Sequence, residues 1–189
     1  MTGPTPGSTT PDRADEHRRF DDLFREHRAT VLGFLVRRVE QPADAADLLA
    51  EVFLVAWRRL DAVPDGDRGR LWLYGVAHKL LSNHRRGRRR RDALTGELAA
   101  HLGRPGVVPG GDPAPQAAEV RAAIRSLPPD DRAILTLNAW EGLSSPEIAG
   151  VLGMNPSTVR VRLHRARARL RDQLDLPGRD GDQATAVTG

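Results

Sequence analysis

Residues 155–174 decide the fold of this chain, and they read NPSTVRVRLHRARARLRDQL. Asn155 is a favourable N-cap residue, and Pro156 follows at the first helical position, where its missing N–H costs nothing. Apolar side chains then recur at helical spacing, at Val159, Leu163, Ala166 and Leu170. Only Asp172 opposes the arginines around this stripe, which are Arg160, Arg162, Arg165, Arg167, Arg169 and Arg171. The stretch predicts an amphipathic helix with a core face and a cationic face.

A short second helix is predicted just upstream, in residues 143–154 (LSSPEIAGVLGM). Ser144 and Glu147 have the spacing of a capping box, and Gly153 allows a tight turn. The apolar face consists of Ile148, Ala149, Val151 and Leu152. A short helix, a glycine turn and a basic helix predict a helix-turn-helix whose second helix enters the major groove of DNA. The alternative is two core helices with a solvated arginine face.

The composition favours an all-α protein without thiol chemistry. Aromatic residues make up only 4% of the 189 residues, and alternating apolar and polar runs are absent. The absence of cysteine excludes disulfides and thiolate zinc sites. No apolar run approaches the length of a membrane span, and the N-terminus lacks an apolar signal core. We therefore expect a cytoplasmic protein.

Charge is distributed unevenly along the chain, although the formal net charge is only +4. Residues 20–67 carry six arginines and ten acids, whereas residues 68–91 carry eight arginines, Lys79 and no acid. Residues 154–174 carry six arginines and one acid. Arginine suits phosphate groups and guanine edges. Two separate basic segments indicate a polyanion that is contacted at two places.

We expect two small helical domains joined by a flexible linker. Residues 1–16 and 176–189 are predicted to be disordered tails, and residues 92–115 are predicted to be the linker because they are rich in Gly and Pro. The first domain covers residues 17–91 and the second, the helix-turn-helix domain, covers residues 116–175. A helix-turn-helix of this kind is typical of winged-helix-like domains.

Three helices are predicted in the first domain, at about residues 20–39, 45–60 and 68–86. Asp44 can cap the second helix, along which Asp44, Asp47 and Glu51 form an acidic stripe. The third helix carries Trp72 and Tyr74 and leads into NHRRGRRRR (83–91). Aromatic side chains beside a dense arginine run suit single-stranded nucleic acid. The alternative is that both aromatics belong to the core and that the arginine run is a solvated tail.

The second domain begins with a helical pattern from Gln116 that Pro128-Pro129 ends. Asp130 or Asp131 can start the next helix, and Gly142 ends it. The apolar faces of these two helices are Val120, Ala123, Ile124 and Leu127, then Ala133, Ile134, Leu137 and Trp140.

The sequence offers little for catalysis. It has no phosphate-binding glycine loop and no nucleophile elbow, and its six histidines have no metal-type pairing with carboxylates. We therefore expect no enzymatic activity, no cofactor and no metal.

Taken together, these motifs resemble an extracytoplasmic-function (ECF, group IV) sigma factor of bacterial RNA polymerase. DAADLLAEVFLVAW (44–57) resembles the core-binding helix of that family, and RLWLYGVAHK (70–79) with NHRR (83–86) resembles its promoter-melting segment. Its −35-binding domain is matched by five further strings, which are LPP (127–129), EGLS (141–144), EIA (147–149), LG (152–153) and TVRVRLHRAR (158–167). Both sets in this order are more specific than the helix-turn-helix alone.

The resemblance implies that residues 17–91 form sigma region 2 and that residues 116–175 form sigma region 4, and it implies residue roles. Residues that match the core-polymerase-binding positions are Asp44, Asp47, Leu48, Glu51, Val52 and Phe53. Residues that match the positions for binding and melting the −10 element are Trp72, Tyr74, Lys79, Asn83, Arg85 and Arg86, with flipped bases in a pocket next to this helix. Residues that would face the −35 duplex are Ser157, Thr158, Arg160, Arg162, His164 and Arg165.

The partners that the resemblance implies are promoter DNA and core RNA polymerase, through the clamp coiled coil of its largest subunit and the flap of the second large subunit. An anti-sigma factor is a further implied partner, and the chain could be held inactive by such a partner. Two other readings stay open. One is a stand-alone helix-turn-helix transcription regulator, and the other is an RNA-binding or nucleic-acid-processing enzyme that uses the arginine run.

Overall fold

A computed structural model describes residues 13–102 and 115–174, which are helical apart from short connections. These residues divide into two compact units, of which the first contains α1 to α3 and the second contains α4, α5, α7 and most of α6. Each unit is described by itself. The described residues contain no β-strand, so the helix-turn-helix has no β-wing within residues 115–174.

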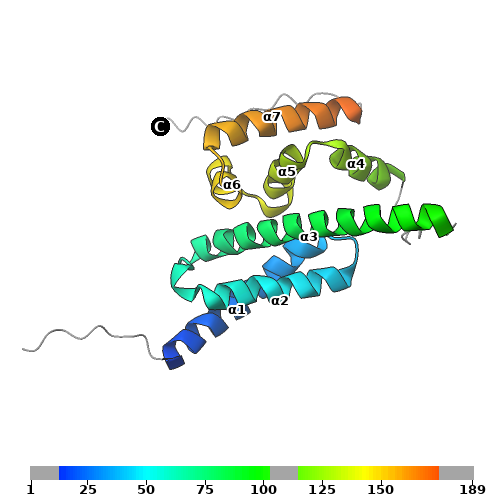
Figure 1. The fold of residues 1–189 in the computed structure, drawn as a ribbon. Helices are drawn as coiled ribbons and strands as arrows, with labels where there is room; N and C mark the ends of the chain where they lie inside the picture. Colours follow the sequence, from blue (N-terminus) through cyan, green and yellow to red (C-terminus); the bar gives the residue numbers. More distant parts are fainter. Residues whose placement is uncertain (1–12, 103–114, 175–189) are drawn as a thin grey trace, which may run out of the picture. The chain divides into compact units, whose positions relative to one another are not determined.

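Three helices and one 3-10 turn build the first unit: α1 (Arg13–Val36), α2 (Pro42–Arg58), η1 (Leu60–Ala62) and α3 (Asp67–Leu102). The three α-helices pack on one another (Figure 1). Each contributes apolar residues to one core, and the most buried are Val31, Phe34, Leu35, Ala45, Val52, Ala56, Leu73, Tyr74, Ala77 and Leu81. This core accounts for the apolar helical spacing of all three segments.

The helix starts differ from the expected ones. Helix α1 begins at Arg13, inside the stretch expected to be a tail, and the acids in its first turn suit a helix N-terminus. Helix α2 begins at Pro42 with Gln41 as the N-cap residue, so the prediction that Asp44 caps this helix was wrong. Proline is favoured at the first helical position, and this moves the start three residues upstream. Asp44 lies in the first turn instead.

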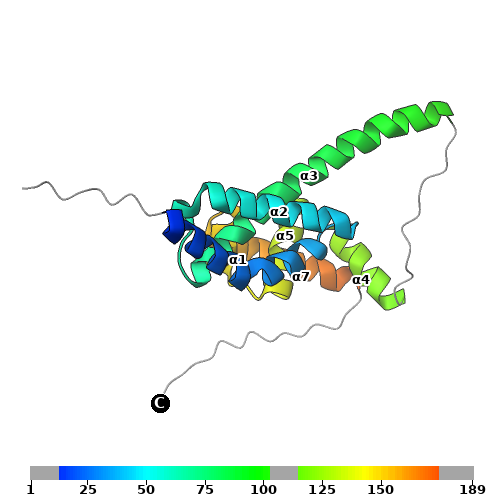
Figure 2. The same cartoon turned by 90° about the horizontal axis from the view of Figure 1, so that it is seen from below.

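Helix α3 is longer than expected. It continues to Leu102 rather than ending near residue 86, and it enters the stretch expected to be a linker. Residues 88–102 contain mainly Arg, Ala, Leu and Glu, which are strong helix formers, and one glycine does not outweigh them. The C-terminal part of α3 projects beyond α1 and α2 (Figure 2). The tails at residues 1–12 and 175–189 and the linker residues 103–114 lie outside the described part.

The turn between α2 and α3 depends on two glycines. Gly66 has φ +62°, a left-handed conformation that favours glycine. At Gly69 a Cβ atom would lie 2.8 Å from the carbonyl oxygen of Pro64. The close approach of this turn to the first turn of α3 therefore requires glycine at position 69.

The second unit contains α4 (Pro115–Ser126), α5 (Pro129–Glu141), α6 (Ser145–Leu152) and α7 (Pro156–Gln173). The capping predictions for the helix-turn-helix are confirmed. The Asn155 side chain accepts a hydrogen bond from Ser157 N at 2.9 Å, and Glu147 Oε2 accepts one from Ser144 N at 2.8 Å. Gly153 has φ +66°, as the turn requires.

Packing in the second unit confirms most of the predicted apolar faces. Its core includes Leu127, Ile134, Leu137, Leu143, Ile148, Val159, Leu163 and Ala166. Trp140 is an exception, because 42% of its surface is exposed. Asp130 and Asp131 lie in the first turn of α5 and do not cap it, since Pro128 is the N-cap residue. Among the described residues, no helix is long and apolar enough to cross a membrane.

We predict that two leucines on α1 differ sharply in their contribution to stability. Leu35 is fully buried, whereas Leu32, three residues earlier, is 37% exposed. Leu35→Ala should lower the free energy of unfolding by about 2–5 kcal/mol, because it leaves a cavity. The matched control Leu32→Ala should cost clearly less. Urea unfolding followed by tryptophan fluorescence measures both, and equal losses would contradict the core described above.

Candidate nucleic-acid interface

Helix α7 presents one solvent-exposed face opposite its buried stripe. By helical spacing this face centres on Ser157, Val161 and His164 and is flanked by Arg160 and Arg165. Each of these side chains is exposed, as is Thr158. Five of the six residues predicted to face duplex DNA are therefore exposed here without an ion pair among the described residues.

Arg162, the sixth, is bound within the protein. Its Nη1 atom donates a hydrogen bond to Asp130 Oδ2 at 2.6 Å and lies 3.8 Å from Asp131 Oδ1. Arg169 Nη1 donates to Asp131 Oδ2 at 2.9 Å. These ion pairs connect one edge of α7 to the first turn of α5, so this edge differs from the open face around Arg160.

Val161 is a residue that the sequence reasoning missed. It is 51% exposed and lies between arginines on the outer face of α7. An apolar side chain at this place can contact the methyl group of thymine in the major groove. The signal was present in the sequence, because Val161 is two residues after the buried Val159 and therefore points away from the core.

Helix α3 has an outer face with the features expected of a single-strand site. Trp72, Lys79, Asn83 and Arg86 recur at helical spacing and share one side of the helix. Lys79, Asn83 and Arg86 are exposed, and Arg86 Nη2 donates to Asn83 Oδ1 at 2.5 Å. Lysine and arginine along one exposed stripe suit a phosphate backbone.

Tyr74 does not belong to this face. It is only 1% exposed, and its ring stacks on Phe34 with the ring centroids 4.8 Å apart. In this structure Tyr74 is a core residue, so its predicted role as a stacking platform for bases does not fit. Helical spacing explains the difference, because Tyr74 lies about 200° around the helix from Trp72.

The inner side of the arginine run binds the junction between α1 and α2. Arg88 Nη2 donates to Glu40 Oε2 at 2.5 Å, and Arg88 Nη1 lies 3.6 Å from Asp44 Oδ2. His84 Nε2 lies 3.6 Å from the same Asp44 oxygen, and Arg85 Nη2 donates to the carbonyl oxygen of Arg38 at 3.0 Å. Arg85, predicted to contact the −10 element, is thus bound to the segment after α1, and Asp44, predicted to bind the polymerase, faces α3.

The predicted polymerase-binding residues of α2 also divide into two groups. Asp47 and Glu51 are exposed one turn apart. Leu48, Val52 and Phe53 are buried, with only 3%, 0% and 4% of their surface exposed, which does not fit direct contact with a docked protein.

Exposed apolar residues near this acidic stripe were missed. Leu54 is 47% exposed and follows Glu51 by three residues, and Trp57 and Phe24 are each 37% exposed. The Phe24 ring contacts the Phe53 ring at a centroid distance of 4.8 Å, which connects this surface of α1 to α2. A signal for this surface was present in the sequence, because Leu54 lies outside the core-facing spacing of α2 and is therefore predicted to be exposed.

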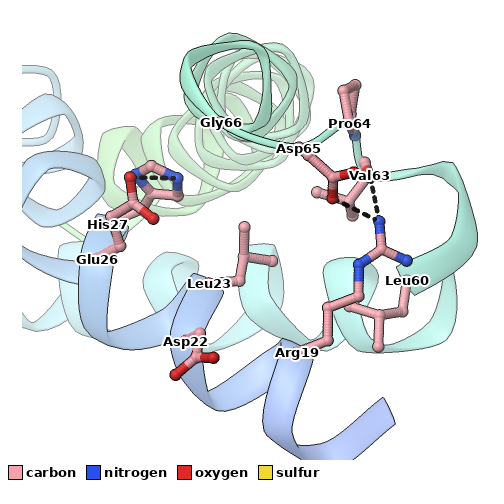
Figure 3. A pocket seen from close by; sticks show the side chains of 10 residues that line it. All are labelled: Arg19, Asp22, Leu23, Glu26, His27, Leu60, Val63, Pro64, Asp65 and Gly66. Carbon is pink, nitrogen blue, oxygen red and sulfur yellow. Dashed lines mark hydrogen bonds and ion pairs between the residues drawn. The ribbon is translucent and has the colours of Figure 1, made fainter. Parts of the chain in front are cut away.

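A cavity of about 390 Å³ lies between α1 and the turn before α3 (Figure 3). Three carboxylates line it, from Asp22, Glu26 and Asp65, together with Arg19. The Arg19 guanidinium is already bound, since Nη2 donates to the Val63 carbonyl oxygen at 2.8 Å and to Asp65 Oδ1 at 3.1 Å. The excess of negative charge opposes a phosphate group in this cavity.

The described residues contain no group of three or more His, Asp or Glu side chains that could hold a metal ion. The candidate sites are thus charged and apolar helix faces.

Two family profiles match the chain. The profile of sigma-70 region 2 matches residues 23–91, which lie in α1 to α3, and the profile of sigma-70 region 4 matches residues 117–170, which lie in α4 to α7.

Curated relatives match most of the chain. It is 36% identical over 166 residues to the ECF RNA polymerase sigma factor SigE of Mycolicibacterium smegmatis, covering 82% of this chain and 61% of that relative. It is 32% identical over 155 residues to the RNA polymerase sigma factor CarQ of Myxococcus xanthus, covering 82% of this chain and 88% of CarQ. The chain therefore spans less than two thirds of that SigE but most of CarQ.

Solved structures share the arrangement of helices. CnrH in complex with the cytosolic domain of CnrY is 28% identical with a TM-score of 0.58, covering 86% of this chain and 91% of that chain. The sigma factor RpoE in complex with the anti-sigma factor NepR from Bartonella quintana is similar in fold, with a TM-score of 0.63 at 21% identity over 85% of this chain and 99% of that chain.

We predict that two nearby arginines of α3, Arg88 and Arg90, contribute unequally to the free energy of unfolding. Arg88 is bound to Glu40 and Asp44, whereas Arg90 is exposed and lies on the outer side of the helix. Arg88→Ala should lower the free energy of unfolding by about 1 kcal/mol, because the ion pairs are partly shielded from water. Arg90→Ala should change it by less than about 0.5 kcal/mol. Thermal unfolding measures both, and the ranking should be lost in high salt.

Proposed function

The chain belongs to the ECF sigma factors of bacterial RNA polymerase, and on this premise we propose that it binds core polymerase, directs it to promoters and helps to open them. It recognises a −35 element through α7 and a −10 element through α3, and it has no catalytic activity of its own. The observation that carries the proposal is that each unit has one basic helix face, on α3 and on α7, and that α2 in addition has an acidic and apolar face.

In this proposal the outer face of α7 binds the −35 duplex in the major groove. Ser157, Thr158 and Arg160, near the helix N-terminus, contact base edges, and Val161 contacts a thymine methyl group. His164 and Arg165 hold phosphates further along the helix. The exposure of all six side chains supports these assignments.

The outer face of α3 binds the −10 element as a separated strand. Lys79 and Arg86 neutralise phosphates and Asn83 donates hydrogen bonds, while Trp72 provides an apolar surface for an unstacked base. Their common side of the helix and the exposure of three of them support this role. Tyr74 and Arg85 are left out, because the first is buried and the second is bound to Arg38.

Core polymerase docks on the surface formed by Asp47, Glu51, Leu54, Trp57 and Phe24, which we call the α2 docking surface. Exposed apolar side chains beside carboxylates are typical of a protein interface. The clamp coiled coil of the largest polymerase subunit is the partner that this family suggests, and the flap of the second large subunit is the partner proposed for the second unit. The site of action is the cytoplasm.

An anti-sigma factor is a further partner that we propose, because RpoE and CnrH are described in complexes with NepR and CnrY. The competing function is a stand-alone helix-turn-helix regulator. It accounts for α7 but leaves the region 2 match over residues 23–91 without a role.

Run-off transcription tests the proposal. Purified core polymerase is incubated with a pool of genomic promoters from the source organism, with and without the full chain. Discrete new transcripts that require the chain are expected. Core polymerase that neither binds the chain nor yields transcripts would contradict the proposal and favour the stand-alone regulator.

We predict that charge reversal on the α2 docking surface abolishes core binding. Asp47→Arg combined with Glu51→Arg should remove the association seen by size-exclusion chromatography, because both side chains are exposed and their reversal places positive charge on the docking surface. The circular dichroism spectrum should stay unchanged, since neither residue is in the core.

Asp61→Arg is the control, because Asp61 is an exposed acid on η1 outside this surface. It should retain core binding. Binding by the double variant at the wild-type level would refute the docking assignment, and a loss with Asp61→Arg would indicate a general effect of charge.

A further inference from the structure

The first turn of α5 carries two carboxylates against the basic edge of α7. Asp130 Oδ2 accepts a hydrogen bond from Arg162 Nη1 at 2.6 Å, and Asp131 lies between Arg162 and Arg169 at 3.8 and 2.9 Å. The same residues line a surface depression of about 520 Å³ together with Arg165, Pro128 and Pro129. Two acids and two arginines therefore form a neutral cluster at the edge of an otherwise cationic helix.

The two acids have different surroundings. The Asp131 side chain is only 10% exposed, so its charge is satisfied inside the unit, mainly by Arg169. The Asp130 side chain is 60% exposed and its hydrogen bond is made to Arg162, whose side chain is 36% exposed. Asp130 thus contributes little to the core of α5 and acts chiefly on Arg162.

A neutralised arginine adds less to DNA binding than an unpaired one. Each arginine that binds a phosphate releases counterions, and this contribution does not depend on sequence. To bind a phosphate, Arg162 would have to leave the carboxylate of Asp130, which would then face the DNA as an unpaired negative charge. Base-edge contacts from Arg160 and its neighbours would be unaffected by the pairing.

We infer that Asp130 is a positioning residue that withholds Arg162 from the DNA backbone and so sets the overall affinity for DNA and its salt dependence. This rests on the proposed function of α7. The pairing removes one sequence-independent contact, so it lowers the affinity for promoter and scrambled DNA by the same factor and leaves the ratio between them unchanged. The residue acts on DNA through Arg162 and need not touch DNA itself.

Binding of the full chain, as holoenzyme with core polymerase, tests this inference on two duplexes at several salt concentrations. One duplex contains a promoter found by run-off transcription, and the other has its −35 element scrambled. Asp130→Asn should bind both more tightly than wild type by the same factor, with the ratio between them unchanged. A fourfold rise in salt should weaken the variant about threefold more than wild type, as one added phosphate contact requires.

Two further variants distinguish the effect of the Asp130–Arg162 ion pair from the effects of net charge and of stability. Asp172→Asn makes the same change of charge on α7 without releasing an arginine, because Asp172 is exposed and makes no ion pair among the described residues, so it should keep the wild-type salt dependence. Arg162→Ala in the Asp130→Asn background should abolish the gain, whereas a general effect of Asp130 on stability would persist in that double variant.

The outcomes are distinguishable. A wild-type holoenzyme that shows no preference for the promoter overturns the proposed function and this inference with it. A wild-type preference combined with unchanged binding by Asp130→Asn overturns the inference alone. A loss of promoter binding by Asp130→Asn also overturns it, because the carboxylate would then position Arg162 for DNA.

Discussion

The stacking of Tyr74 on Phe34 fixes the rotation of α3, and the candidate interface of the first unit depends on that rotation. The two rings lie 4.8 Å apart between centroids, and the guanidinium of Arg38 covers the Phe34 ring at 3.8 Å. A helix is stiff, so a side chain anchored near its start sets the direction of those that follow. Lys79 and Arg86 consequently face solvent.

Arginine has two uses in this protein, and the nearest carboxylate decides between them. Arg88 of α3 and Arg162 of α7 bind acids on neighbouring helices, whereas Arg86 and Arg160 are on the outer faces. The guanidinium group is the same in both cases. A paired arginine stabilises its unit and offers less positive charge to a polyanion, so the number of arginines in a segment overstates the charge available to DNA.

Much of the architecture was predictable because it depends on neighbours in sequence. Asn155, Ser144 with Glu147, and Gly153 act within a few residues of themselves, and the structure confirms their roles. The errors arose where the choice depended on other elements. Local preference allowed Asp44 or Asp130 to cap a helix, but a proline upstream began each helix earlier and left the carboxylates for His84 and Arg162 on other helices.

By itself the sequence determined which segments contain helices, though not where α1 and α2 begin or α3 ends, together with the caps of the helix-turn-helix and the division of charge between segments, since all of these follow from spacing along the chain. The family also follows from it, because the motifs are local strings. Only the tertiary structure decided that Tyr74 lies in the core whereas Trp72 is partly exposed. It likewise decided which arginines are bound. Burial and ion pairing depend on contacts between helices, and helical spacing fixes only the relative directions of side chains on one helix.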